Sequence, residues 1–251
     1  MAEDTKDVSH EDFVDRAKET IGQFKLPSGY LDQQGILHRD ILIREMTGAE
    51  EDLLVSGSAS VFQTLIERCV VELGTFKQTD PNWSKIMKSL PYSDHVFMLI
   101  RLRTVSLGRQ MSFSVKCPSC AKTSNQAVDL FDFVVQGLKD PTSRRTTVEL
   151  PSGAKVILNP ATLEDEEKCK MIKDLATREL AMRCEAINGN IPTVESLKAL
   201  SFRDRRALSK MIREYEGEID NEVEMICPHC SHMFKSEVSV WDRNFFFPSE
   251  I

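Results

Sequence analysis

Two short cysteine motifs carry the most specific chemistry in this sequence. They read Cys117-Pro118-Ser119-Cys120 and Cys227-Pro228-His229-Cys230. A C-x2-C turn directs two thiolates toward one point, and two such turns supply the four sulfur ligands of a closed tetrahedral zinc site. Strand-like runs flank both motifs, as in a zinc ribbon: Met111–Lys116, Thr123–Leu130, Glu222–Ile226 and Met233–Val240. We therefore predict one structural Zn2+ ion bound by Cys117, Cys120, Cys227 and Cys230.

The same motifs are compatible with other chemistry. In one alternative, the two cysteine motifs (zinc knuckles) only form the turns between neighbouring strands and bind no metal. Cys-Pro-His-Cys can also be a redox dithiol at a helix N-terminus, but a strand-like run follows it here and a matching motif occurs elsewhere. His229 or His232 is an alternative ligand in place of one cysteine.

Catalysis is disfavoured by the motifs that the sequence lacks. A zinc deaminase requires a His-x-Glu motif, which none of the five histidines begins. Four thiolates leave no open metal position for a reacting water. The sequence also contains no P-loop, dinucleotide fingerprint or serine elbow. We predict that the protein is not an enzyme and has no small-molecule substrate.

Composition narrows the class of protein further. The net charge of −7 argues against a protein that wraps nucleic acid, because that task requires a surplus of Lys and Arg. No apolar run approaches the roughly 20 residues of a membrane helix, and the first residues lack the features of a signal peptide. Four of the seven cysteines are in C-x2-C pairs, which indicates metal ligands and free thiols in a reducing cytosol.

The chain also repeats itself. Leu26-Pro27-Ser28-Gly29 recurs as Leu150-Pro151-Ser152-Gly153, and the helix start at Thr47 recurs at Thr162. Further matches follow in the same order, with few changes of offset, and end with the two cysteine motifs. This order predicts a tandem duplication of about 100 residues. Each copy would end in one knuckle, so that a single zinc ion would join the two copies.

We therefore expect an α+β fold in which a unit of strand hairpin, helices and zinc knuckle occurs twice. Helices are predicted near 60–73, 94–103, 173–187 and 202–215. The expected segments are an N-terminal arm at 1–25, a first repeat at 26–132, a linker at 133–149, a second repeat at 150–242 and an aromatic tail at 243–251.

Two segments outside the repeats are candidates for partner binding. In the N-terminal segment, Phe13, Ile21 and Phe24 recur at helical spacing after a predicted cap at Ser9. The C-terminal stretch contains four aromatic residues, Trp241, Phe245, Phe246 and Phe247. Packing of either segment on its own chain is the alternative, because exposed aromatic residues in such number promote aggregation.

The region from Leu26-Pro27-Ser28-Gly29 to Thr47-Gly48-Ala49-Glu50-Glu51 resembles the start of the baseplate hub family of T4-like contractile-tailed bacteriophages. The paired Cys-Pro-x-Cys knuckles and the Phe-rich C-terminus are similar to long members of that family. The resemblance implies a non-enzymatic protein of the virion tail baseplate, made in the host cytoplasm, that acts in the hub or in its assembly. Its partners would be other tail or baseplate proteins.

A second hypothesis is a zinc-ribbon adaptor or regulator that binds nucleic acid or a polymerase. The acidic composition and the absence of a cluster of Lys and Arg on the knuckles favour the baseplate hypothesis.

Overall fold

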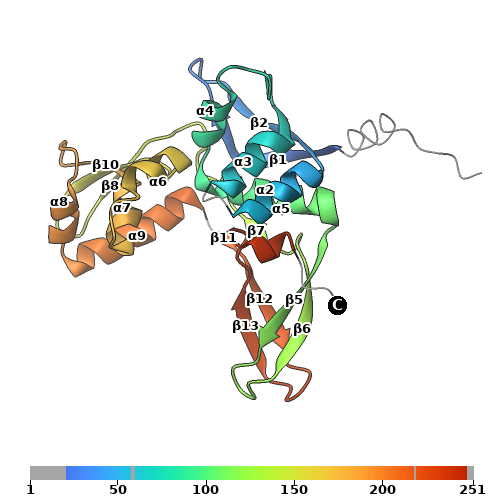
Figure 1. Ribbon diagram of the computed structural model, residues 1–251. Coiled ribbons are helices and arrows are strands. Elements are labelled where there is room, and N and C mark those ends of the chain that lie inside the picture. The colour runs from blue at the N-terminus through green and yellow to red at the C-terminus, as the bar shows by residue number, and fades with distance from the viewer. Residues whose placement is uncertain (1–20, 58–59, 218, 248–251) are drawn as a thin grey trace, which may run out of the picture.

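The computed structural model describes residues 21–57, 60–217 and 219–247, which form two α/β units and a projecting stem (Figure 1). The first unit contains an antiparallel sheet in the order β1-β2-β3-β4. Its strands are β1 (Ile21–Leu31), β2 (Leu37–Arg44), β3 (Val70–Leu73) and β4 (Phe76–Lys77). Its helices are α2 (Gly48–Ser56), α3 (Val61–Cys69), α4 (Trp83–Lys88) and α5 (Tyr92–Leu107).

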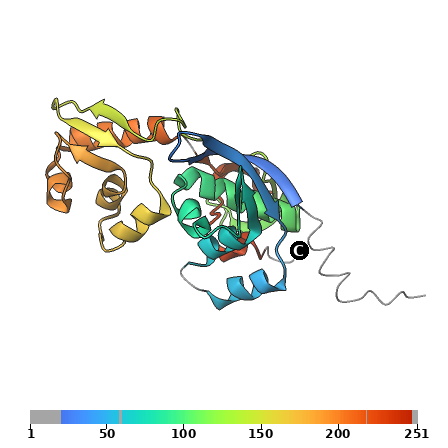
Figure 2. The same ribbon diagram turned by 90° about the horizontal axis from the view of Figure 1, so that it is seen from above.

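The second unit is a smaller version of the same arrangement. A three-stranded sheet has the order β10-β9-β8, and helices cover it on one side (Figure 2). The strands are β8 (Thr146–Glu149), β9 (Lys155–Leu158) and β10 (Cys184–Ile187). The helices are α6 (Leu163–Cys169), α7 (Leu175–Ala181), α8 (Val194–Ala199) and α9 (Phe202–Glu216).

Two β-hairpins lie side by side and form the stem (Figure 1). The first consists of β5 (Gln110–Lys116) and β6 (Thr123–Asp129), and the second of β12 (Glu222–Ile226) and β13 (Met233–Glu237). Two short strands, β7 (Val134–Val135) and β11 (Ile219–Asp220), pair with each other above the stem. The stem therefore joins chain segments from both halves of the sequence.

The first hydrophobic core is completed by the end of the chain. Val238, Val240, Phe245 and Phe246 are buried with residues of β1 to β3, α3 and α5. A 3₁₀ helix, η1 (Arg243–Phe245), brings the two Phe residues into that core. The second core is separate, and its buried residues come only from positions between Leu138 and Tyr215. The boundaries of the structural units therefore differ from those of the two sequence repeats. Residues from the segment 219–247, which follows the second unit in the chain, pack in the core of the first unit.

Three sequence predictions of secondary structure need correction. The predicted N-terminal helix cannot include Ile21 and Phe24, because both lie in β1, where Phe24 pairs with Ile41 of β2. Phe13 and the predicted cap lie outside the described residues. The helices predicted at 60–73 and 173–187 each end early and continue as strands β3 and β10. In these segments strand pairing with a neighbour overrides a helical pattern of apolar residues.

Within the described residues, each helix is too short or too polar to cross a lipid bilayer.

Candidate metal centre

The two cysteine motifs form the same turn at the tip of each hairpin. In the first, the amide of Cys117 donates to the carbonyl of Lys122, and the amide of Ala121 donates to the carbonyl of Cys117. In the second, Cys227, His232 and Ser231 make the same two bonds. The residue after each motif has a left-handed backbone, with φ of 59° at Ala121 and 58° at Ser231. This turn orients both thiols of a motif toward the same side.

The four sulfur atoms form one cluster. All Sγ atoms lie within 4.8 Å of one another, and the pairs Cys117–Cys230 and Cys120–Cys227 are each 3.7 Å apart. A zinc ion with sulfur ligands at about 2.3 Å requires sulfur–sulfur distances of about 3.8 Å in a regular tetrahedron. A disulfide would require about 2.05 Å, and the cysteines are free thiols. The cluster thus fits a tetrahedral metal ion of this size.

The surroundings shift the pKa values of two thiols of the cluster in opposite directions. Burial acts to raise the pKa of Cys227, but amide donors at His229 and Cys230 outweigh it and lower this pKa to about 6. The amide of His232 acts to lower the pKa of Cys230, but its contacts with the other thiols raise that pKa to about 11. Thiolate is the form that binds metals.

Among the described residues, the group of side chains that could hold a metal ion consists of the four cysteines and includes no histidine. The His229 ring instead approaches the carbonyl of Thr123 at 3.3 Å, which links the two hairpins. The ring of His232 stacks on Phe234. The structure therefore brings the four predicted cysteines together and assigns both histidines to packing between and along the hairpins.

The other cysteines differ in character. Cys69 and Cys184 are buried in the first and second core, and burial raises the pKa of each thiol to about 12. Cys169 is half-buried in α6, and burial raises its pKa as well. The raised pKa values keep these thiols protonated at neutral pH, and Cys69 and Cys184 act as small core side chains.

Most of the predicted partner-binding aromatic residues contact their own chain. Phe245 and Phe246 are 1% and 3% exposed in the first core, and Trp241 stacks on Tyr92 of α5. Phe247 and Ile21 are more exposed, at 37% and 48%. Phe245 and Phe246 therefore pack on their own chain, which was the alternative to partner binding for the C-terminal segment.

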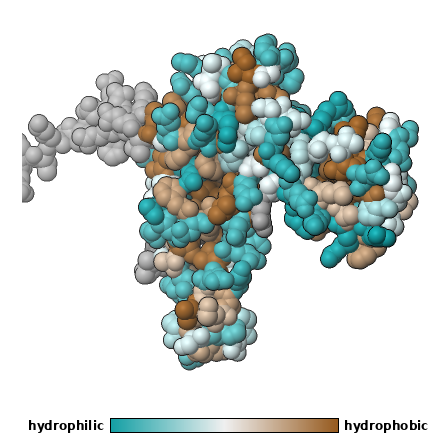
Figure 3. Space-filling model, turned by 180° about the vertical axis from the view of Figure 1, so that it is seen from behind, coloured by the Kyte–Doolittle hydropathy of each residue, from teal (hydrophilic) through white to brown (hydrophobic). Residues whose placement is uncertain are grey.

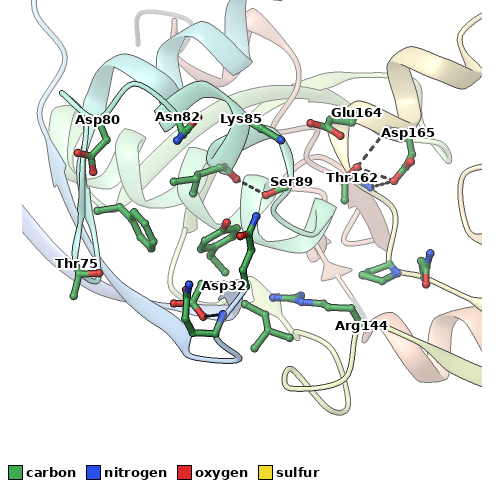
Figure 4. Close-up of a pocket in the computed structure, with 18 of the residues that line it drawn as sticks. Asp32, Thr75, Asp80, Asn82, Lys85, Ser89, Arg144, Thr162, Glu164 and Asp165 are labelled. Atoms are coloured by element: carbon green, nitrogen blue, oxygen red, sulfur yellow. Dashed lines mark hydrogen bonds between the residues drawn. The ribbon is translucent and has the colours of Figure 1, made fainter.

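A cleft of about 1040 Å³ lies where the two units meet (Figure 4). Its wall includes Asp32 from the β1–β2 turn, Ser89 after α4, and Arg144, Thr162 and Asp165 from the second unit. Each of these groups already has a local role. Asp32 contacts His38, Ser89 donates to the carbonyl of Ile86, Arg144 donates to the carbonyl of Gly29, and Thr162 and Asp165 cap α6. The cleft lies between the two units, and its scattered residues gave no signal in the sequence.

Comparison with known proteins gives one result. The chain belongs to the family described as T4 bacteriophage base plate protein, whose pattern it matches over residues 23–247. No significant match was found among the curated proteins or among the solved structures.

Proposed function

We propose that this member of the T4 base plate protein family is a non-enzymatic component or assembly factor of the central hub of the tail baseplate. In the mature particle it would reside in the virion tail, in contact with other tail proteins. The family match carries the baseplate role. The hub assignment is supported by the resemblance of residues 26–51 and of the paired knuckles to baseplate hub proteins.

A single structural zinc ion, bound by the four cysteines of the stem, would stabilise the protein. The observation that supports this is the sulfur cluster, whose two 3.7 Å contacts each join one hairpin to the other. The connected cysteines are 107 and 113 positions apart in the chain. An ion at this point would close a very long loop, and structural zinc contributes on the order of 10 kcal/mol to folding in small domains.

A tandem duplication explains why each half supplies two ligands. In the first unit, the amides of Ser28 and Gly29 each donate to Asp94 at 2.8 Å. In the second, the amide of Ser152 donates to Asp204 at 3.1 Å, and these are positions that the sequence repeat aligns. Capping boxes at Thr47 and Thr162 also correspond. Shared hydrogen bonds at aligned positions support descent of the two halves from one ancestral unit.

Metal analysis tests the shared site. We expect purified protein to contain about one zinc ion per chain, since two knuckles supply four ligands. Cys117→Ser and Cys227→Ser should lose equal amounts of metal and of thermal stability, whereas Cys169→Ser, outside the cluster, should retain the metal. Two ions per chain, or a metal content that only one knuckle affects, would contradict a shared site.

Quantitative mass spectrometry tests the baseplate role. Purified phage particles and infected-cell lysate would be compared for this chain, with the tail tube protein as an internal standard. A small fixed copy number in particles is expected for a resident hub component. Presence in assembly intermediates and absence from particles would identify an assembly factor, and absence from both would refute the proposal.

A further inference from the structure

The outer face of α9 carries a line of positive charge. Arg203, Arg206, Lys210 and Arg213 are exposed and follow one another at intervals of three or four residues, which places them on one side of the helix. Among the described residues, only Lys210 of these four has an ion-pair partner, Glu214 at 3.7 Å. Hydrophilic residues gather along the lower edge of the second unit, where α9 runs (Figure 3). This basic face of α9 is unusual in a chain with a net charge of −7.

The equivalent helix of the first unit is covered by protein. Nine residues of α5 are buried, from Ser93 to Arg103, and the C-terminal segment packs against this helix. The buried Nε of Arg103 donates to the carbonyl of Phe245 at 2.6 Å. In α9 only Asp204, Leu208, Ile212 and Tyr215 are buried. The second unit therefore has an outer helix face that no described segment of the chain covers.

An exposed aromatic residue begins the same helix. Phe202 is 79% exposed, and the guanidinium of Arg206 lies 5.8 Å from the centre of its ring. A partner for this surface needs negative charge along its length and an apolar group near one end.

The first 20 residues of the chain have that chemistry. They contain seven acidic and three basic residues, and an acidic residue stands at every fourth position: Glu3, Asp7, Glu11, Asp15 and Glu19. Phe13 and Val14 provide apolar side chains in the same segment. The described chain begins at β1, on the side of the molecule away from α9 (Figures 1 and 2). That placement favours a contact between molecules over one within a molecule.

We propose that residues 1–20 of one copy bind the basic face of α9 of a neighbouring copy. Such a contact joins two different surfaces, so that repetition produces a ring or a filament. Its attraction comes from exposed charges, and therefore weakens as salt rises. The proposal does not depend on zinc, because neither surface belongs to the stem.

Sedimentation velocity of the full-length protein tests the contact. We expect self-association at about 50 mM salt that is largely lost at about 500 mM. Arg206→Glu with Arg213→Glu should weaken association by about tenfold, from the loss of two ion pairs. Lys155→Glu with Lys173→Glu is the matched control, since both lysines are exposed in the same unit, and it should associate as the wild type does.

A charge exchange makes the test specific for the proposed segment. Glu11→Lys with Asp15→Lys should also weaken association, and a protein with all four reversals should recover it. Circular dichroism melting should show that every variant is folded. A wild-type protein that is monomeric at both salt concentrations, or association that the arginine reversals leave unchanged, would overturn the proposal. Binding of a short oligonucleotide that requires Arg206 and Arg213, without self-association, would assign the face to nucleic acid instead.

Discussion

Replacement of Phe245 by alanine should strongly destabilise the first unit. The side chain is 1% exposed, its ring meets that of Phe246 edge-on at 5.3 Å, and the Arg103 guanidinium lies 5.7 Å from its centre. Burial of about 200 Å² at about 25 cal/mol per Å² gives about 5 kcal/mol, of which the alanine methyl group retains about 1. Loss of the ring pair adds about 1 kcal/mol. We expect Phe245→Ala to lower the free energy of unfolding by about 4 to 5 kcal/mol.

Urea unfolding followed by tryptophan fluorescence measures this loss. Both tryptophans, Trp83 and Trp241, belong to the first core, so the signal reports on the affected unit. The hydrogen bond from Arg103 to residue 245 uses a backbone carbonyl, and therefore persists in the variant. The difference in unfolding free energy between variant and wild type therefore reports the contribution of the Phe245 side chain alone.

Phe247→Ala is the matched control. Phe247 is 37% exposed, and we expect its replacement to cost about 1 kcal/mol or less. A loss below about 1 kcal/mol for Phe245→Ala, or equal losses for both variants, would refute the inference that the C-terminal aromatic segment forms part of the first core.

Three further predictions concern backbone and charge. Gly29 and Gly153 have φ of +85° and +84°, but an added Cβ would lie 2.4 Å from the His38 carbonyl only at Gly29. Gly29→Ala should therefore lower the melting temperature clearly more than Gly153→Ala, and equal shifts would contradict this. Burial outweighs the amide donors at Asp94 and raises its pKa to about 6. Its contribution to stability is therefore greatest below pH 4 and falls as pH rises to 6, so the unfolding free energy of wild type relative to Asp94→Asn should decrease over that range. For Glu50, burial acts to raise the pKa, but Arg44 and Thr47 lower it to about 2. The contribution of Glu50 to the unfolding free energy is present above pH 4.5 and is lost as pH falls toward 2. In urea unfolding at a series of pH values, Glu50→Gln should therefore lose less stability between pH 4.5 and pH 2 than the wild type does. An equal loss in both proteins would exclude a stabilising ion pair.

The local features of this fold were predictable from sequence where one short pattern determines them. Nearby residues determine the helix starts at Thr47 and Thr162 and the long helices α5 and α9. The sulfur cluster was predictable too, because C-x2-C turns have few structural uses. The prediction needed no knowledge of the chain between the two motifs.

Features that depend on distant pairing were not predictable. Val70–Leu73 follows a helix with an apolar stripe, and its pairing with β2 and β4 makes it a strand. The same holds for Ile21–Phe24, whose helical spacing is overridden by pairing with β2. The return of Phe245 to α5 is set by a contact across 142 positions, which a single sequence does not reveal.

The position of Phe245 and Phe246 also has a consequence for synthesis. Residues 21–107 of the first unit are translated before the second unit, yet the core of the first unit lacks these two rings until residues 245 and 246 have been translated. A contact across 142 positions has a high entropic cost of loop closure, which slows folding. The nascent first unit would therefore expose part of α5 during elongation of the second unit. A chain truncated shortly before residue 245 should bind chaperones that the complete chain releases.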